Sequence, residues 1–235
     1  MRRDEQFRQL QILDSCGADT VERFWQSGKM MTLPKGQLCI RAREETPNIF
    51  FILEGKVQIY NLTGCGKKKI LFVLGRGHIA NESLLERSGS VFCETMEPCL
   101  LYALRQRVLL ELMEKDFQLT KELLYYQEKK IWRLEHQLKN TVGSIYLERK
   151  LAAKLLKLAR DFGVPTEQGR MIDVELSITF LSDFLGVPRE TTSRVCRKLT
   201  DYGLIIMNKK KICLPDTERM ISFYKTGVLP DKLSS

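Results

Sequence analysis

The sequence predicts an α+β protein with a β-rich N-terminal part, a long helix and a helical C-terminal part. Short strand-like runs separated by glycine turns fill residues 33–104, which is typical of a β-sandwich or barrel. Apolar residues recur every seven positions from 117 to 145. Residues 177–214 contain two short helical patterns followed by a hairpin pattern. We expect three regions with boundaries at 1–112, 113–146 and 147–235.

The β pattern is clearest between Asn48 and Tyr60. A run of five apolar residues, 49–53, is followed by Glu54-Gly55 and by alternating apolar and polar residues, which predicts two strands joined by a turn. We expect further strands at 69–74 and 99–104, and a short one after the turn at 33–36.

The heptad positions predict one long helix and a contact surface on it. They hold Phe117, Leu124, Ile131, Leu138 and Ile145, and neither proline nor glycine occurs from 115 to 142. A repeat of 3.5 residues favours a seam between two helices of a dimer. The alternative is one helix packed on its own domain. Our expected dimer contacts are Leu124, Ile131, Leu134 and Leu138.

Residues 179–202 predict a helix-turn-helix. Thr179 is a candidate N-cap for a helix over 180–185, and Gly186 marks its end. Pro188 fits the start of the next helix, which we expect from Arg189 to about Tyr202, because its missing N–H has no partner there.

The second of these helices has two different faces. The spacing i, i+3, i+4, i+7 puts Thr192, Val195, Cys196 and Leu199 toward the core. On the other face, arginine fits guanine O6 and N7, Glu190 can accept from cytosine N4, and hydroxyls can donate to phosphates. A solvated charged helix is the alternative, but the preceding turn favours major-groove DNA. The candidate contacts are Arg189, Glu190, Thr191, Ser193, Arg194 and Arg197.

Residues 204–214 read as a β-hairpin with three lysines, 209–211, at its tip. We expect Lys209 and Lys210 to lie against the phosphate backbone as a wing.

Composition fits a globular, DNA-binding chain. Of 235 residues, 43% are hydrophobic and 29% charged, and the net charge is +9. From Glu148 onward there are 16 basic and 11 acidic residues, so +5 of this charge falls in the C-terminal part, which suits an acidic partner. No run of 18 apolar residues and no secretory pattern is present, so we expect a cytoplasmic protein.

The cysteines and histidines predict neither a metal site nor an enzyme. The seven cysteines form no CxxC pair; Cys39, Cys93 and Cys99 lie in strand-like runs and are expected to be buried. A metal-dependent β-barrel enzyme would need two or three clustered histidines. His78 and His136 are the only histidines and lie 58 positions apart.

Three motifs resemble the Crp/Fnr family, named for the cAMP receptor protein and the fumarate–nitrate reductase regulator. Residues 185–194, LGVPRETTSR, look like its helix-turn-helix signature; 52–57, ILEGKV, and 75–85, GRGHIANESLL, resemble its β-roll and effector-pocket turn. The resemblance implies an effector-sensing β-roll like a cyclic nucleotide-binding domain, a dimerisation helix and a winged helix-turn-helix.

The resemblance also implies a function. Base contacts would come from Arg189, Glu190 and Arg194 of a homodimer on a palindromic operator. An effector in the β-roll would reorient the DNA-binding domains. The family mostly activates transcription by touching RNA polymerase, and the loop 163–169 aligns with one surface used for this.

The effector site departs from the pattern of cyclic-nucleotide binders. These have Gly-Glu in the pocket turn and Arg-Ser or Arg-Thr after it, whereas this chain has Asn81-Glu82 and Gly89-Ser90. Arg87 is a possible substitute for the missing phosphate arginine. Glu135 and His136 fall where cyclic-nucleotide binders place small hydroxyl side chains. We therefore expect a small-molecule effector other than cAMP, held by Asn81, Glu82, Arg87, Ser90 and Glu135.

Two alternatives stay open for regulation. The chain could be a cyclic-nucleotide-binding regulatory protein, or a redox-sensing regulator that uses a cysteine. An iron–sulfur cluster is not expected, because Cys16 is the only cysteine near the N-terminus.

Overall fold

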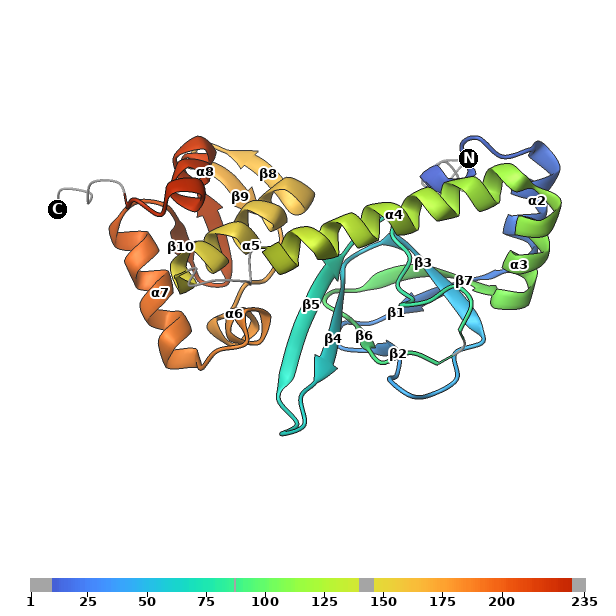
Figure 1. The fold of residues 1–235 in the computed structure, drawn as a ribbon, viewed down its shortest axis with the longest axis horizontal. Helices are drawn as coiled ribbons and strands as arrows, with labels where there is room; N and C mark the ends of the chain where they lie inside the picture. Colours follow the sequence, from blue (N-terminus) through green and yellow to red (C-terminus); the bar gives the residue numbers. More distant parts are fainter. Residues whose placement is uncertain (1–9, 87, 140–145, 230–235) are drawn as a thin grey trace. The chain divides into compact units, whose positions relative to one another are not determined.

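The computed structural model describes residues 10–86, 88–139 and 146–229. It has two compact units, Met1–Leu134 and Glu135–Ser235. Figure 1 shows β-strands and an α-helical layer in the first unit and mostly helices in the second. The long helix α4 (Phe117–Lys139) begins in the first unit, and its residues from Glu135 belong to the second.

In the part of the first unit that the structure describes, seven antiparallel strands form two sheets, ordered β1-β7-β3 and β2-β6-β4-β5. Short helices precede and follow the strands (Figure 1). The elements are η1 (Gln11–Leu13), α2 (Ala18–Ser27), β1 (Lys29–Leu33), β2 (Leu38–Ile40), β3 (Asn48–Glu54), β4 (Val57–Leu62), β5 (Lys68–Leu74), β6 (Phe92–Thr95), β7 (Cys99–Arg105) and α3 (Gln106–Lys115).

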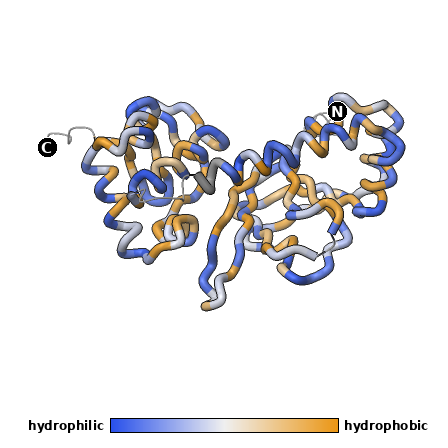
Figure 2. Tube along the Cα trace, viewed as in Figure 1, coloured by the Kyte–Doolittle hydropathy of each residue, from blue (hydrophilic) through white to orange (hydrophobic). Residues whose placement is uncertain are grey.

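Two apolar clusters hold the first unit together. One joins β3 and β7 to the helices through the rings of Phe24, Trp25, Phe51 and Tyr102, whose centroids lie 4.7–6.4 Å apart. The other fills the space between the sheets. Figure 2 shows hydrophobic residues along these strands. Burial of apolar area at both places is the main stabilising contribution.

The clearest strands were predicted correctly, and the least apolar elements were missed. The turn between β3 and β4 is at Gly55, whose φ is +84°, a left-handed conformation that glycine adopts without steric cost. Strand β1 and helix α2 were not predicted, and β6 was expected only as a strand-like run around Cys93. Four of the five β1 residues are exposed, so the strand lacks the apolar alternation that sequence patterns detect.

The predicted uninterrupted helix from Lys115 is wrong at its start. The chain leaves the helical conformation at Asp116, with φ −124° and ψ 98°. Its carboxylate accepts a hydrogen bond from the Gln118 N–H at 2.9 Å, which is the N-cap interaction that starts a new helix. Thus α3 ends at Lys115 and α4 begins at Phe117.

The second unit combines helices with a small antiparallel sheet, ordered β10-β11-β9-β8. The loop expected at 163–169 instead forms β8 and the start of β9, with a turn at 167–168, and the sequence did not predict this hairpin. The further elements are α5 (Leu147–Phe162), β8 (Gly163–Thr166), β9 (Gly169–Ile172), α6 (Ile178–Leu185), α7 (Arg189–Asp201), β10 (Ile206–Asn208), β11 (Lys211–Leu214) and α8 (Thr217–Thr226).

Candidate nucleic-acid interface and effector pocket

Helices α6 and α7 form a helix-turn-helix whose first cap differs from the expected one. The Ser177 hydroxyl, not Thr179, accepts from the Phe180 N–H at 3.1 Å. The helix therefore starts at Ile178, because the capping oxygen must precede the first turn. Gly186, with φ +76°, ends α6, and its N–H donates to the Ser182 carbonyl at 2.7 Å.

Helix α7 packs on the core as predicted. All four predicted inward residues, Thr192, Val195, Cys196 and Leu199, are buried. The Thr192 hydroxyl donates to the Pro188 carbonyl at 3.0 Å, so the one buried polar group of this face has a partner.

The opposite face of α7 is polar and open to solvent. Thr191 is half-buried, and its hydroxyl accepts from the Arg194 guanidinium at 3.4 Å. The remaining candidate DNA contacts on this helix are exposed: Arg189, Glu190, Ser193, Arg194 and Arg197. A convex, mainly cationic helix face of this kind can enter a major groove.

An ion pair fixes α7 to α5. The Lys198 ammonium lies 2.8 Å from the Glu148 carboxylate. Burial opposes ionisation of Glu148, but the hydrogen bond from Lys198 outweighs it, so the pKa of Glu148 lies below its ordinary value. The same hydrogen bond raises the pKa of Lys198. Sequence reasoning missed this pair because its members are 50 residues apart.

The predicted wing is the hairpin β10–β11. Asn208 pairs with Lys211, leaving Lys209 and Lys210 as the two-residue turn, both exposed. Lys209 has φ +53°. Lys211 instead binds Asp173 at 2.7 Å, and Lys210 lies 4.0 Å from Glu175. The turn therefore exposes the ammonium groups of Lys209 and Lys210 to solvent, in the segment that directly follows the helix-turn-helix in the sequence.

The first unit contains a pocket of about 1070 Å³. Its apolar wall comes from β4, β5 and the segment before β6, with Ile59, Leu71, Phe72, Leu74 and Val91. The turn 76–82, residues near η1 and the part of α4 up to Leu134 complete the lining. A concave, mostly apolar space with a few polar groups is the usual form of a small-molecule site.

Three side chains of α4 hold the turn that borders this pocket. Tyr126 Oη accepts from the Ile79 N–H at 2.9 Å. Lys130 Nζ donates to the Asn81 and Glu82 carbonyls at 3.3 and 3.0 Å. Arg133 Nη1 lies 3.2 Å from His78 Nε2. These residues are spaced i, i+4, i+7 and so share one helix face; we call them the α4 ladder.

The ladder is partly withdrawn from water. Burial lowers the pKa of Lys130, with Glu82 opposing this effect, and burial raises the pKa of Tyr126. Because arginine only donates, His78 Nε2 must accept in this contact. The proton of the neutral ring is then on Nδ1, which lies 3.2 Å from the Gly75 carbonyl and 3.3 Å from that of Arg76.

The structure brings together only some of the predicted effector residues. The Glu82 carboxylate accepts from the Ser90 N–H at 2.6 Å and from its hydroxyl at 2.9 Å. Asn81 is committed to β3: it accepts from the Phe50 N–H at 2.8 Å and donates to the Asn48 carbonyl at 2.9 Å. Arg87 lies outside the described residues, and Glu135 is exposed in the second unit.

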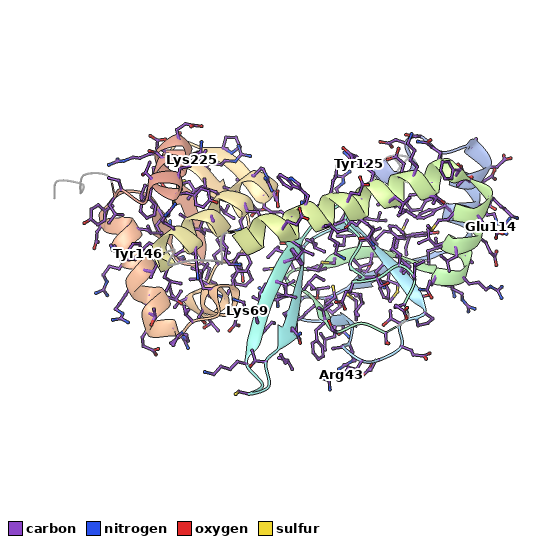
Figure 3. The ribbon with its side chains drawn as sticks, in the orientation of Figure 1. Arg43, Lys69, Glu114, Tyr125, Tyr146 and Lys225 are labelled. Atoms are coloured by element: carbon purple, nitrogen blue, oxygen red, sulfur yellow. The ribbon has the colours of Figure 1, made fainter. Side chains whose placement is uncertain are left out.

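Sequence reasoning missed the ladder, although its i, i+4, i+7 spacing of polar residues was a usable signal. The prediction for this helix rested on its apolar heptad residues instead. Those apolar residues are uncovered in the described chain: Leu124, Ile131 and Leu134 are 58%, 55% and 40% exposed, and the side chain of Leu138 lies outside the description. Figure 3 shows the neighbouring Tyr125 on α4; it is 53% exposed.

Within the described ranges no group of three or more histidine, cysteine or acidic side chains could hold a metal ion. In the same ranges, no helix combines the length and apolar character needed to cross a membrane.

Comparison with known proteins identifies both units. Residues 30–116 match the family described as "Cyclic nucleotide-binding domain", and residues 149–223 match "Crp-like helix-turn-helix domain". The probable transcriptional regulator flp of Lacticaseibacillus casei is 27% identical over 206 residues, which is 87% of each chain.

Solved structures have the same fold. FixK2 from Bradyrhizobium japonicum gives a TM-score of 0.74 at 18% identity, covering 88% of this chain and 99% of that one. A CooA mutant from Carboxydothermus hydrogenoformans gives 0.72 at 18% identity, covering 93% and 99%. The predicted fold class is confirmed.

Replacing Lys198 by methionine tests the ion pair that fixes α7. The lowered pKa of Glu148 makes its contribution to folding stability fully present above the ordinary value of 4.5, and that contribution is lost as the pH falls through the folded pKa. Lys198→Met should therefore lower the free energy of unfolding by up to about 1 kcal/mol at neutral pH. Urea unfolding should show a smaller difference from the wild type below pH 4.5. A difference independent of pH would contradict an ionic origin.

Proposed function

We propose, from the premise that this chain belongs to the Crp/Fnr family of transcription regulators, that it is a homodimeric activator whose DNA affinity is set by a small molecule other than cAMP. The chain is a DNA-binding regulator and not an enzyme. The observation that carries the proposal is the α4 ladder, because it joins the helix with the exposed apolar face to the turn that borders the pocket.

The DNA contacts that we propose are the exposed polar residues of α7 and the wing. Arg189 and Arg194 would each hold a guanine by two hydrogen bonds, and Glu190 would accept from cytosine. Arg197, Lys209 and Lys210 would neutralise phosphates, and Thr191 and Ser193 would donate to them. Exposure of seven of these eight residues and half-exposure of Thr191 support the assignment.

We also propose that two copies associate through α4. An isolated helix that exposes leucine and isoleucine at heptad positions leaves apolar area in water that a second copy would bury. Two-fold symmetry then requires a palindromic operator with half-sites about 10 base pairs apart. The family resemblance supports activation by contact with RNA polymerase through residues 163–169, which here are the hairpin β8–β9, and a location in the cytoplasm, where the DNA is.

Residues 89–90 argue against a cyclic nucleotide. The resemblance places the phosphate arginine of cyclic-nucleotide binders at Gly89, and the N–H and hydroxyl of the next residue, Ser90, are already taken up by the Glu82 carboxylate. A cyclic phosphate would therefore lack the cation that compensates for its burial. A ligand that touches both the turn and α4 could shift the population of dimer states.

The first experiment tests the DNA contacts. Arg189→Ala and Arg194→Ala should each weaken specific binding by about 1–3 kcal/mol through loss of one bidentate base contact. A mobility-shift titration of a genomic fragment selected with the wild type measures this. Arg107→Ala, which removes an 84% exposed arginine from α3, serves as the control. Unchanged affinity in both α7 variants would refute the assignment.

The second tests the dimer. Ile131→Asp puts a charge at the centre of the apolar face and should shift the chain toward a monomer of 27.3 kDa, because an unpaired charge is costly to bury. Light scattering at micromolar concentration measures the mass. Lys67→Asp introduces the same side chain at an exposed position of the β4–β5 hairpin and should leave the dimer intact. A monomeric wild type would rule out the proposal.

The third tests the effector. Isothermal calorimetry should detect no micromolar binding of cAMP, since Gly89 offers no cation to its phosphate. The same titration with Glu82→Gln separates repulsion by this carboxylate from loss of the phosphate arginine. Micromolar binding of cAMP to the wild type, together with tighter operator binding, would overturn the assignment.

A further inference from the structure

Two cysteines lie on neighbouring strands of the first unit, Cys39 on β2 and Cys93 on β6. Cys39 on β2 donates from Sγ to the Cys93 carbonyl on β6 at 3.5 Å, and the two side chains also form a hydrogen bond with each other. Cys93 is fully buried, while Cys39 is half-buried. One member of the pair can therefore be reached from solvent, and the other cannot.

The strand register brings the two backbones close enough for a covalent bond. Leu38 pairs with Glu94 and Ile40 with Cys93, and the irregularity between these pairs places Cys39 next to Cys93. In a β-bulge two residues of one strand oppose one residue of the other, so Cys39 and Ile40 both lie opposite Cys93. Adjacent strands are about 4.8 Å apart, and disulfides span Cα separations of about 4.4–6.8 Å.

The third nearby thiol is turned to a different partner. Cys99 Sγ on β7 donates to the Lys56 and Glu97 carbonyls at 3.3 and 3.2 Å. Cys93 is therefore the thiol that is placed to react with Cys39.

The hydrogen bond gives the two thiols different roles. Donation from Cys93 lowers the pKa of Cys39, whereas this bond and burial raise the pKa of Cys93. Burial raises the pKa of Cys16 and of Cys196 to about 11. Because the thiolate is the reactive form, Cys39 is favoured over Cys93, Cys16 and Cys196 as the first site of oxidation.

We infer that Cys39 and Cys93 form a reversible disulfide when the protein meets hydrogen peroxide. The Cys39 thiolate attacks one peroxide oxygen and the O–O bond breaks. Hydroxide departs, and Cys39 becomes a sulfenic acid. The Cys93 sulfur then attacks the Cys39 sulfur and the S–O bond breaks. The departing hydroxide takes the Cys93 proton and becomes water, so two thiols supply the two electrons that reduce one peroxide.

The bond would form beside the pocket wall. Cys93 pairs with Ile40 on one side and with Ile59 of β4 on the other, and Ile59 lines the pocket together with Val91 from the segment leading into β6. Fixing β2 to β6 therefore constrains the strand that directly supports this wall. Oxidation at this site does not depend on the identity of the effector or the operator.

Peptide mapping of the full-length protein tests the inference. The reduced protein is treated with hydrogen peroxide, the remaining thiols are blocked with N-ethylmaleimide, and the protein is digested without reductant. We expect a cross-linked peptide pair that contains Cys39 and Cys93 and disappears after dithiothreitol. Cys39→Ser should abolish it, and Cys65→Ser, at the exposed thiol of the β4–β5 turn, should retain it.

The wild-type result decides the question even if a variant fails to fold. Oxidation confined to Cys65, a bond from Cys39 to Cys99, or a Cys39 sulfenic or sulfinic acid with Cys93 still blocked by maleimide would each overturn the inference. Cys99→Ser keeps Cys39 and Cys93 intact and should still form the cross-link.

Discussion

The contact between one face of α4 and the backbone of the turn 78–82 determines how the rest of the first unit is used. Tyr126 and Lys130 bind backbone groups of this turn, and Arg133 binds the ring of His78. Since the ladder fixes the rotation of the helix, its apolar residues Leu124 and Ile131 stay exposed. The same contact closes one side of the pocket, so the dimer face, the pocket and the turn are properties of a single docked helix.

The polar contacts of the ladder fix the orientation of α4 more than they add to the folding stability of the first unit. Taking the Lys130 ammonium partly out of water costs free energy, as its lowered pKa records, and two carbonyl oxygens offset this only in part. An apolar side chain at this position would avoid this cost, but it would allow α4 to pack in several registers. Backbone acceptors on the turn admit one rotation of α4, and a ligand that disturbs the turn acts directly on the helix.

Sequence reasoning succeeded where a local pattern carried the information. The buried face of α7, with Thr192, Val195, Cys196 and Leu199, follows from helical spacing alone. It failed where tertiary contacts decide: Ser177 replaces Thr179 as the cap, and β1 forms without apolar alternation. The Cys39–Cys93 pair depends on an irregularity in the strand register, which no spacing in the sequence reveals.

The central claim is that α4 holds the pocket turn through side chains of one face, and amide hydrogen exchange tests it most directly. The Ile79 N–H donates to Tyr126 Oη, so Tyr126→Phe removes its acceptor while keeping the ring. The account predicts that the Ile79 amide exchanges faster in this variant, while the amides of β3 and β7 keep their wild-type rates. An unchanged rate at Ile79 would show that the turn is held without the helix and would contradict the account.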